Sequence, residues 1–363
     1  MWDNVTKTPR GVAMTLSIDD AVKTGRDSAA GSEEAPAIND EYTDALQTLS
    51  EGSVRKHFDP YEDIDWDSPE FRVDPTDRRW ILPKADPLGR HPWYLAQPED
   101  KQIEIGMWRQ ANIMRVGMHF ENVLIRGIMQ YVWNLDNGNP EFRYLTHEAA
   151  EECNHTQMFQ EGVNRIGADV PGMTGLLRKL VPFAEIAVKF YPEWFFTFVL
   201  GGEEPIDHLQ KSILRAGGEI HPMLERVMQI HVAEEARHIS FAHKYLERNV
   251  PQANLVKRHL LSVLFPVTMR WMCDIIIIPP KEFGEKFDIP KSVLKELYWD
   301  TDESKETLRN IFGDVRALAR HSGLMTPVGK LAWKLCGIGG RESRFRSEPT
   351  ADQTIVANLT RAA

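Results

Sequence analysis

The chain is poor in cysteine, and this scarcity excludes two kinds of stabilising site. Only three of its 363 residues are cysteines (Cys153, Cys273 and Cys336), and none of them belongs to a Cys-x-x-Cys pair. We therefore expect neither a disulfide framework nor a cysteine zinc site. A reducing compartment, the cytoplasm, fits this composition best.

The sequence also lacks a long uninterrupted apolar run. Charged residues interrupt the first 35 positions, so no secretory signal is indicated there. The most apolar stretch, from Leu260 to Ile278, contains Pro266, Arg270 and Asp274. This pattern predicts a buried, proline-kinked helix rather than a membrane span, and therefore a soluble protein without a membrane partner.

Positive charge is scarce as well. The 43 lysines and arginines are outnumbered by 53 aspartates and glutamates, which gives a net charge of −10. Because binding to a phosphate backbone requires a positive surface, we expect no nucleic-acid partner, and a tRNA-directed hydroxylase is disfavoured. The hydrophobic fraction of 42%, with 16 phenylalanines and 10 tryptophans, is ample for a large buried core.

The composition changes along the chain and predicts three parts. Residues 1–40 are polar and predict a flexible tail. Residues 41–98 are rich in Trp, Pro and Asp, which predicts an irregular wrap with one short helix over 42–50. We expect one domain over residues 41–325, followed by a C-terminal helix and tail over 326–363.

The pattern becomes helical after Pro98. Asn139 and Pro140 predict the start of one long helix, and Gly167 predicts its end. The third long helix contains interruptions at Pro192 and at Gly201-Gly202. The long helices are expected over 99–135, 140–167, 181–216 and 222–250, and shorter ones over 252–279, 290–299, 302–322 and 327–336. Since no strand pattern is present, the fold class is all-α, with a core of four long helices.

Two of the long helices carry the same short motif. Residues 150–155 read Ala-Glu-Glu-Cys-Asn-His, and residues 233–238 read Ala-Glu-Glu-Ala-Arg-His. Each contains Glu-x-x-His, formed by Glu152 and His155 in one helix and by Glu235 and His238 in the other. Residues three apart are neighbours on one helix face, so each pair presents a carboxylate and an imidazole together.

The helix before each motif supplies one more glutamate, Glu121 in the first helix and Glu203 or Glu204 in the third. One glutamate from each of two helices and Glu-x-x-His from each of the other two form the ligand set of carboxylate-bridged di-iron or di-manganese bundles. Two imidazoles suit iron better than magnesium or calcium. The motif thus predicts a ferritin-like di-iron bundle.

His231 lies four residues before Glu235 and shares its helix face. The matching position in the other motif is Glu148, so a third histidine breaks the repeat. We interpret His231 as a seventh metal ligand. The alternative is a histidine that hydrogen-bonds to a ligand carboxylate.

Glu203 and Glu204 compete for one ligand position. Helical phase around Ile206 places Glu203 on the inward face and Glu204 nearly opposite, whereas the spacing in the other half of the repeat favours Glu204. The neighbouring Gly201-Gly202 and Pro205 predict a distorted turn of the bulged kind. Glu203 is the preferred ligand and Glu204 the alternate.

With these residues in place, the chain resembles the p-aminobenzoate N-oxygenase family of ferritin-like di-iron oxygenases over about residues 40–325. The feature that separates this family from other di-iron bundles is the histidine four residues before the second Glu-x-x-His, here His231 before Glu235 and His238. The resemblance implies a homodimer with two irons per chain, which activates O2 as a peroxo species with electrons from an external donor. It also implies oxidation of an aromatic amine through the hydroxylamine to the nitro product.

The region expected to contact substrate departs from the family pattern. The family's aminobenzoate enzyme has small polar and tyrosine side chains near the first-helix glutamate, whereas this sequence has an apolar set, Ile113, Met114, Gly117 and Phe120. A late-helix arginine anchors the substrate carboxylate in the family. The candidates here are Arg309, Arg316 and Arg320, and the sequence does not choose among them.

These patterns lead to one preferred function and two alternatives. N-oxygenation of an aromatic amine is the first, and C-hydroxylation or desaturation of an apolar substrate is the second. A ferritin-like iron oxidase or storage module is a third function from a different class. It is disfavoured because the irregular wrap and the C-terminal helices would obstruct a cage. Outside the metal centre, no catalytic side chain or further cofactor-binding residue is predicted.

Overall fold

The structure of the protein is a computed structural model that describes residues 41–173, 175, 179, 186, 188–217 and 219–350. All regular secondary structure in these residues is helical, and the chain shows the ferritin-like all-α fold expected from the sequence. The predicted tail over 1–40, the residues after 350 and most of the segment 180–187, where the third long helix was expected to begin, lie outside the described residues.

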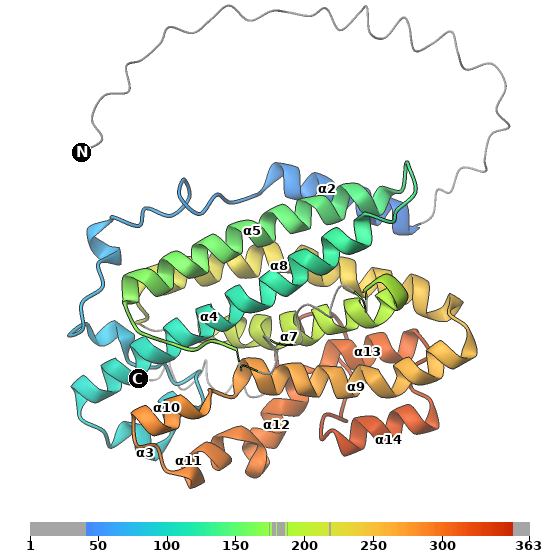
Figure 1. Cartoon of the computed structure of the whole chain (residues 1–363). Helices are drawn as coiled ribbons and strands as arrows, with labels where there is room; N and C mark the ends of the chain where they lie inside the picture. The colour runs from blue at the N-terminus through green and yellow to red at the C-terminus, as the bar shows by residue number, and fades with distance from the viewer. Residues whose placement is uncertain are drawn as a thin grey trace, which may run out of the picture. The chain divides into compact units, whose positions relative to one another are not determined.

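Four long helices form the bundle, and they pair as two consecutive helical hairpins (Figure 1). The first hairpin contains α4 (Glu99–Val132) and α5 (Pro140–Ile166), and the second contains α7 (Pro192–Ala216) and α8 (Pro222–Asn249). The side chain of Asn139 accepts a hydrogen bond from the Glu141 amide and caps α5. At the other end of α5, Gly167 adopts φ 70°, a left-handed conformation that favours glycine.

Helix α7 begins at Pro192, where an interruption was predicted, but it runs without a break through Gly201, Gly202 and Pro205. The interruption predicted at Gly201-Gly202 and the bulged turn are therefore wrong. The two glycines serve packing between helices instead. A Cβ at Gly202 would overlap the ring of Phe120 on α4, and a Cβ at Gly201 would lie 3.1 Å from Met272. Glycine at these positions lets α7 approach both neighbours closely.

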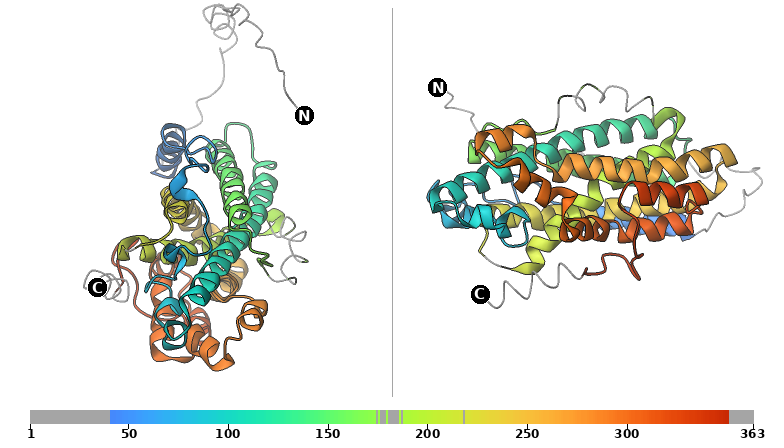
Figure 2. Two further views of the ribbon diagram at one scale, coloured as in Figure 1. Left: turned by 90° about the vertical axis from the view of Figure 1, so that its left-hand side faces the viewer. Right: turned by 90° about the horizontal axis from the view of Figure 1, so that it is seen from below.

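The C-terminal helices gather on the α7 side of the bundle, where α9 packs along α7 and α14 packs on α9 (Figure 2). Two expectations fail here. The segment expected as one helix over 302–322 divides at Phe312, and the helix expected over 290–299 ends at Lys295. A short helix, α10, was not predicted. The helices of this region are α9 (Leu255–Ile277), α10 (Lys281–Lys286), α11 (Lys291–Lys295), α12 (Asp302–Ile311), α13 (Gly313–His321) and α14 (Pro327–Leu335).

A turn over Glu296–Asp300 replaces the end of the predicted helix. Trp299 in this turn adopts φ 80°, a conformation that costs a bulky side chain about 1–3 kcal/mol. Its indole nitrogen donates a hydrogen bond of 2.7 Å to Asp274 of α9, and the Arg270 guanidinium lies 5.9 Å from its ring. These two contacts hold the strained residue in place.

The wrap begins with α2 (Glu41–Arg55), which is longer than expected and packs along α5 and α8. Residues 56–98 then form three short 3-10 turns and the single-turn helix α3 (Pro92–Leu95). The ring of Trp80 stacks on His221 at the start of α8, with 4.3 Å between ring centroids. The irregular wrap is thus tied to the bundle by buried aromatic residues.

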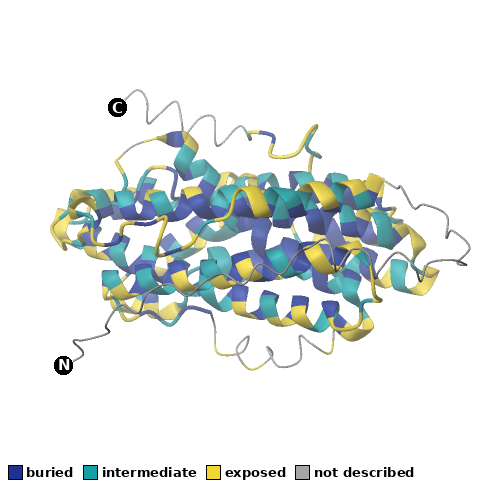
Figure 3. Cartoon of the chain, turned by 90° about the horizontal axis from the view of Figure 1, so that it is seen from above, coloured by how far each residue is buried: buried dark blue, intermediate teal, exposed yellow. Residues whose placement is uncertain are grey.

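Buried residues line the interior of the bundle (Figure 3), and the apolar ones among them form two clusters. On α5 the division falls between Ala149 and Met158. On α8 the division falls between Ile230 and Ile239. Buried polar side chains occupy the level between the two clusters, and this level is where the predicted ligands lie.

One helical stretch of the described chain, from Leu255 to Lys286, is long and apolar enough to cross a membrane by length and composition. Half of the residues in its most apolar 18-residue segment are buried inside the protein. The core helices of soluble bundles meet the same criteria, and α9 packs in the core through Phe265, Met269 and Met272.

Candidate metal centre

The seven side chains predicted as ligands lie together in the interior of the bundle, each at most 2% exposed. Each of the four bundle helices contributes at least one of them. They are Glu121 of α4, Glu152 and His155 of α5, Glu203 of α7, and His231, Glu235 and His238 of α8.

Their ligand atoms form overlapping groups, each with all of its atoms within 4.8 Å of one another. Glu235 and His155 belong to two of these groups, and so do Glu121 and Glu152. The groups are Glu121, His155, His231 and Glu235; Glu152, His155, Glu235 and His238; and Glu121, Glu152 and Glu203. Shared carboxylates of this kind suit two adjacent metal ions that are bridged by glutamate.

The donor atoms themselves fit metal ions. Buried polar groups ordinarily have hydrogen-bond partners, and here several converge without one. Among the described residues, both carboxylate oxygens of Glu203 and of Glu235 lack a hydrogen-bond partner, as do Glu121 Oε2 and His231 Nε2. These unpartnered oxygens and the imidazole nitrogen form a mixed donor set of the kind that iron prefers.

The structure separates Glu203 from Glu204. Glu203 is fully buried and faces Glu121 and Glu152 in the cluster. Glu204 accepts a hydrogen bond of 2.9 Å from His243 Nε2 and lies outside the three groups. The helical phase of the unbroken α7 therefore places Glu203, the preferred candidate, with the other predicted ligands.

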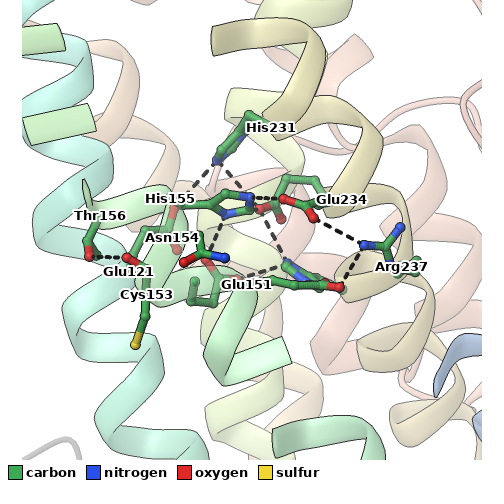
Figure 4. A network of polar contacts seen from close by, with 12 residues as sticks. Glu121, Glu151, Cys153, Asn154, His155, Thr156, His231, Glu234 and Arg237 are labelled. Carbon is green, nitrogen blue, oxygen red and sulfur yellow. Dashed lines mark hydrogen bonds and ion pairs between the residues drawn. The ribbon is translucent and has the colours of Figure 1, made fainter. Parts of the chain in front are cut away.

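Two of the three histidines are oriented by carboxylates from the opposite motif, and Figure 4 shows the contact of His155 with Glu234. His155 of α5 contacts Glu234 of α8 through Nε2 at 2.9 Å, while its Nδ1 points to the centre. His238 of α8 contacts Glu151 of α5 through Nε2 at 2.7 Å, and its Nδ1 also points to the centre. We call these two contacts the reciprocal braces. Such outer partners fix the ring orientation and keep the proton on the nitrogen that faces away from the metal.

Arg237 joins the two reciprocal braces. Its guanidinium lies 2.7 Å from Glu151 and 3.5 Å from Glu234, so one cation serves both carboxylates. The wrap adds a further contact, because the amide of Phe58 donates to Glu234 at 3.1 Å. Asn154 in turn donates to the Phe58 carbonyl at 3.0 Å. Sequence reasoning missed these partners, although both glutamates stand in the repeated Ala-Glu-Glu motif.

The third histidine has an oxygen from an amide as its partner. His231 Nδ1 lies 2.9 Å from Gln210 Oε1 of α7, and its Nε2 faces Glu121 and Glu235 at 3.5 Å. Burial lowers the pKa of His231 to about 4, so the ring is neutral at physiological pH. A neutral imidazole with its Nε2 free is ready to bind a metal. Gln210 was not predicted, because its pairing with His231 depends on how α7 and α8 face each other.

The carboxyl groups of the metal-free cluster differ in pKa, so some of them are protonated and others ionised. Burial, together with Glu152, holds the pKa of Glu121 well above its usual range, and burial with Glu235 does the same for Glu203. Burial opposes ionisation of Glu152 as well, but His238 and His155 lower its pKa to about 2. The metal-free centre therefore holds protons that bound metal ions would displace.

Glu148 occupies the position in α5 that corresponds to His231 in α8. It is 1% exposed, and neither of its carboxylate oxygens has a hydrogen-bond partner among the described residues. Burial raises the pKa of Glu148 to about 8. The two halves of the repeat thus differ at this position in chemistry as well as in sequence.

Two cavities share Leu209 of α7 in their linings, and we name them the inner and outer chambers. The inner chamber, about 40 Å³, reaches Glu121 and His231 and is otherwise mainly apolar. The four apolar residues singled out in the sequence, Ile113, Met114, Gly117 and Phe120, all line it. The outer chamber, about 340 Å³, lies between the wrap, α7 and the C-terminal helices.

The three late-helix arginines line neither chamber. Arg309 pairs with Glu306 at 2.6 Å on the surface, and Arg320 pairs with Glu342. Arg316 is buried, and it donates to the carbonyl of Ile338 at 2.8 Å. Each of the three arginines thus has a partner within the protein, and none of them is placed to contact a substrate in either chamber.

Comparison with known proteins gives a family and several close relatives. A family model described as P-aminobenzoate N-oxygenase AurF matches residues 39–323. An uncharacterized protein of Mycobacterium bovis is 58% identical over 317 residues, which cover 87% of this chain and 93% of the relative. An uncharacterized protein of Mycobacterium tuberculosis strain H37Rv matches with the same identity and coverage.

Proposed function

We propose a function for this chain from one established fact: it belongs to the p-aminobenzoate N-oxygenase family. The function is that of an O2-activating di-iron oxygenase which oxidises the nitrogen of a small aromatic amine. The observation that carries this proposal is the convergence of seven buried carboxylate and imidazole side chains, several of whose donor atoms have no hydrogen-bond partner among the described residues.

The side chains of the centre would have two roles, to bind the irons and to orient the ligands. Glu121, Glu152, Glu203 and Glu235 would hold two irons together with the three histidines, and the bound irons would supply the chemistry of O2 activation. The reciprocal braces keep a proton on the outward Nε2 of His155 and His238, so that Nδ1 of each ring is free to bind metal.

The inner chamber would hold the reacting end of the substrate beside Glu121 and His231. Its apolar lining limits access of water, which protects a reactive centre from side reactions. The same apolar lining favours C-hydroxylation or desaturation of an apolar substrate as a second candidate. We also expect a cytoplasmic homodimer that takes electrons from an external donor.

Iron storage is the candidate from a different class. The surfaces that a cage-forming bundle would use are covered here, since α2 packs on α5 and α8, and α9 packs on α7. Size-exclusion chromatography with mass measurement separates the two possibilities. A dimer supports the oxygenase proposal, whereas a large closed assembly supports storage.

Metal analysis of the purified, iron-reconstituted protein tests the proposal directly. We expect close to two irons per chain, and loss of most iron in Glu152→Ala and in Glu235→Ala. The reduced protein, mixed with O2 and aniline, should form an N-oxygenated product. Fewer than one iron per chain, or zinc alone after iron reconstitution, would refute the di-iron assignment.

A further inference from the structure

A row of aromatic rings begins beside the metal centre. Phe241 lies three residues after His238 on α8, so the two side chains are neighbours on the helix surface. The ring of Tyr144 on α5 packs against Phe241 with 4.9 Å between ring centroids. Burial raises the pKa of Tyr144 well above its usual range, and the charge of His238 also acts on its hydroxyl. The inner end of the row therefore lies next to a predicted metal ligand.

Two further tyrosines continue the row away from the centre. The ring centroid of Tyr245 on α8 lies 6.0 Å from that of Phe241, and the centroid of Tyr131 on α4 lies 5.7 Å from that of Tyr245. Phe196 of α7 packs against both tyrosines, at 4.2 Å from Tyr245 and 5.4 Å from Tyr131. Tyr144 and Tyr245 are buried, whereas Tyr131 is partly exposed. The row thus connects the buried centre with the surface in short steps.

The outer end of the row has a proton acceptor. Tyr131 donates a hydrogen bond of 2.6 Å to one carboxylate oxygen of Glu141, and Tyr42 of α2 donates one of 2.7 Å to the other. Glu141 is the second residue of α5, at the end of the bundle where the chain turns from α4 into α5 (Figure 1). Burial raises the pKa of both phenols, so both are neutral in the resting protein.

These groups have the chemistry of an electron path. Tyrosine gives up an electron far more readily than phenylalanine, and the oxidised phenol is a strong acid that needs a nearby base. Glu141 is such a base for Tyr131, because it already accepts the hydrogen bond from its hydroxyl. A centre that has reacted with O2 but holds no substrate is a strong oxidant, and the histidines that bind it are themselves open to oxidation. A tyrosine row beside it offers another source of electrons.

We propose that Tyr144, Tyr245 and Tyr131 form an electron path that protects the metal centre when it is oxidised in the absence of substrate. In each use, the centre gains one electron, Tyr131 loses one electron, and the phenolic proton of Tyr131 moves to Glu141. Tyr144 and Tyr245 pass the electron inward and end unchanged. An external one-electron reductant such as ascorbate then restores Tyr131, which regains its proton from Glu141. This inference rests on the proposed function, because O2 activation at the centre supplies the oxidant.

Electron paramagnetic resonance of the full-length, iron-loaded protein tests the path. The reduced protein is mixed with O2 without substrate and is then rapidly frozen. We expect the signal of an organic radical, and its hyperfine structure should narrow in protein grown on ring-deuterated tyrosine. Ascorbate added before freezing should remove the signal, because Tyr131 is partly exposed.

Substitutions of single groups locate the path. Tyr245→Phe removes the middle relay and should abolish most of the radical signal. Tyr131→Phe should leave only a weak signal that ascorbate removes slowly, because Tyr245 is 3% exposed. Glu141→Gln keeps an acceptor for the hydroxyl but cannot take its proton, so the signal should fall here too. Tyr94→Phe makes the same chemical change at a buried tyrosine of the other apolar cluster, and it should give the wild-type signal.

Oxidative damage to the centre is a second measurement. After repeated cycles of reduction and exposure to O2 without substrate, mass spectrometry should detect more oxidation of His155 and His238 in Tyr245→Phe than in the wild type. Iron content and the melting temperature before the first cycle should be the same in both proteins, so the difference would not arise from a loss of fold.

Three outcomes would overturn the inference. They are no tyrosine radical in the wild type although O2 oxidises its centre, an unchanged radical signal in both Tyr245→Phe and Tyr131→Phe, and equal histidine oxidation in Tyr245→Phe and the wild type. Each can occur in a protein that holds two irons and oxidises aniline, so failure of the inference is distinguishable from failure of the proposed function. A protein that binds no iron would contradict the proposed function instead.

Discussion

The reciprocal braces should contribute measurably to metal affinity. Replacing Glu234 with Ala removes the acceptor that lies 2.9 Å from His155 Nε2, and replacing Glu151 with Ala removes the acceptor 2.7 Å from His238 Nε2. Without its acceptor, each imidazole loses both its fixed orientation and the negative charge that makes it a stronger ligand.

The expected size of the effect follows from the contacts. Loss of an outer-shell carboxylate typically weakens metal binding 10- to 100-fold, or about 1.4–2.8 kcal/mol. Glu234 also accepts from the Phe58 amide, and Glu151 holds Arg237 at 2.7 Å. Because each variant also leaves one of these donors without its carboxylate, we expect effects toward the upper end of this range.

Anaerobic competition with a chromophoric Fe(II) chelator measures the affinity. Each variant should lose iron to the chelator more readily than the wild type, since each removes the carboxylate that orients one histidine of the cluster. Glu234→Gln and Glu151→Gln should show smaller losses, because an amide oxygen can still accept from the ring. Glu161→Ala removes a carboxylate that pairs with Arg165 near the surface of the same helix, α5, and serves as the control. Wild-type iron affinity in both Glu→Ala variants would refute this account of the braces.

Three further predictions concern individual side chains. Glu203→Ala should abolish product formation while Glu204→Ala retains much of it, and the opposite result in a turnover assay would exclude Glu203 as the ligand. His231→Ala should keep near-normal iron content but alter the transient absorption after reduced protein meets O2, with turnover lowered at least about tenfold, roughly 1.4 kcal/mol; a wild-type spectrum and rate would show that His231 is neither ligand nor essential partner. The melting temperature of metal-free protein should fall as pH rises from about 5 to 8, because Glu121, Glu203 and Glu148 are held neutral in the folded state and ionise more easily when unfolded. A melting temperature that rises over this interval would contradict the assigned pKa directions.

Local signals in the sequence were sufficient for the bundle helices α4, α5 and α8 and for the set of converging side chains. Asn139 and Pro140 mark the start of α5, and the helical phase of Glu203 selects the inward residue. Such features depend on residues a few positions apart, which is the range over which helical periodicity is reliable.

What the sequence could not show depends on how distant segments meet. The partnership of Gln210 with His231 requires α7 and α8 to face each other at one level. The unbroken course of α7 through Gly201 and Gly202 is explained by Phe120 and Met272, which lie on other helices. The strained turn at Trp299 likewise depends on Asp274, which is 25 residues away in the chain. Tertiary contacts override local preference at each of these positions.

The reciprocal braces have a consequence for how such a site could have arisen. The α4–α5 hairpin carries His155 but not the carboxylate that orients it, and the α7–α8 hairpin carries His238 but not its orienting carboxylate. Neither hairpin is complete without the other. If an ancestor was a single hairpin later duplicated, it could have bound metal in this way only as a pair of chains, each lending its glutamate to the other's histidine. Fusion of two copies would then have allowed position 148 and position 231 to diverge into a glutamate and a histidine, a difference that identical subunits cannot have.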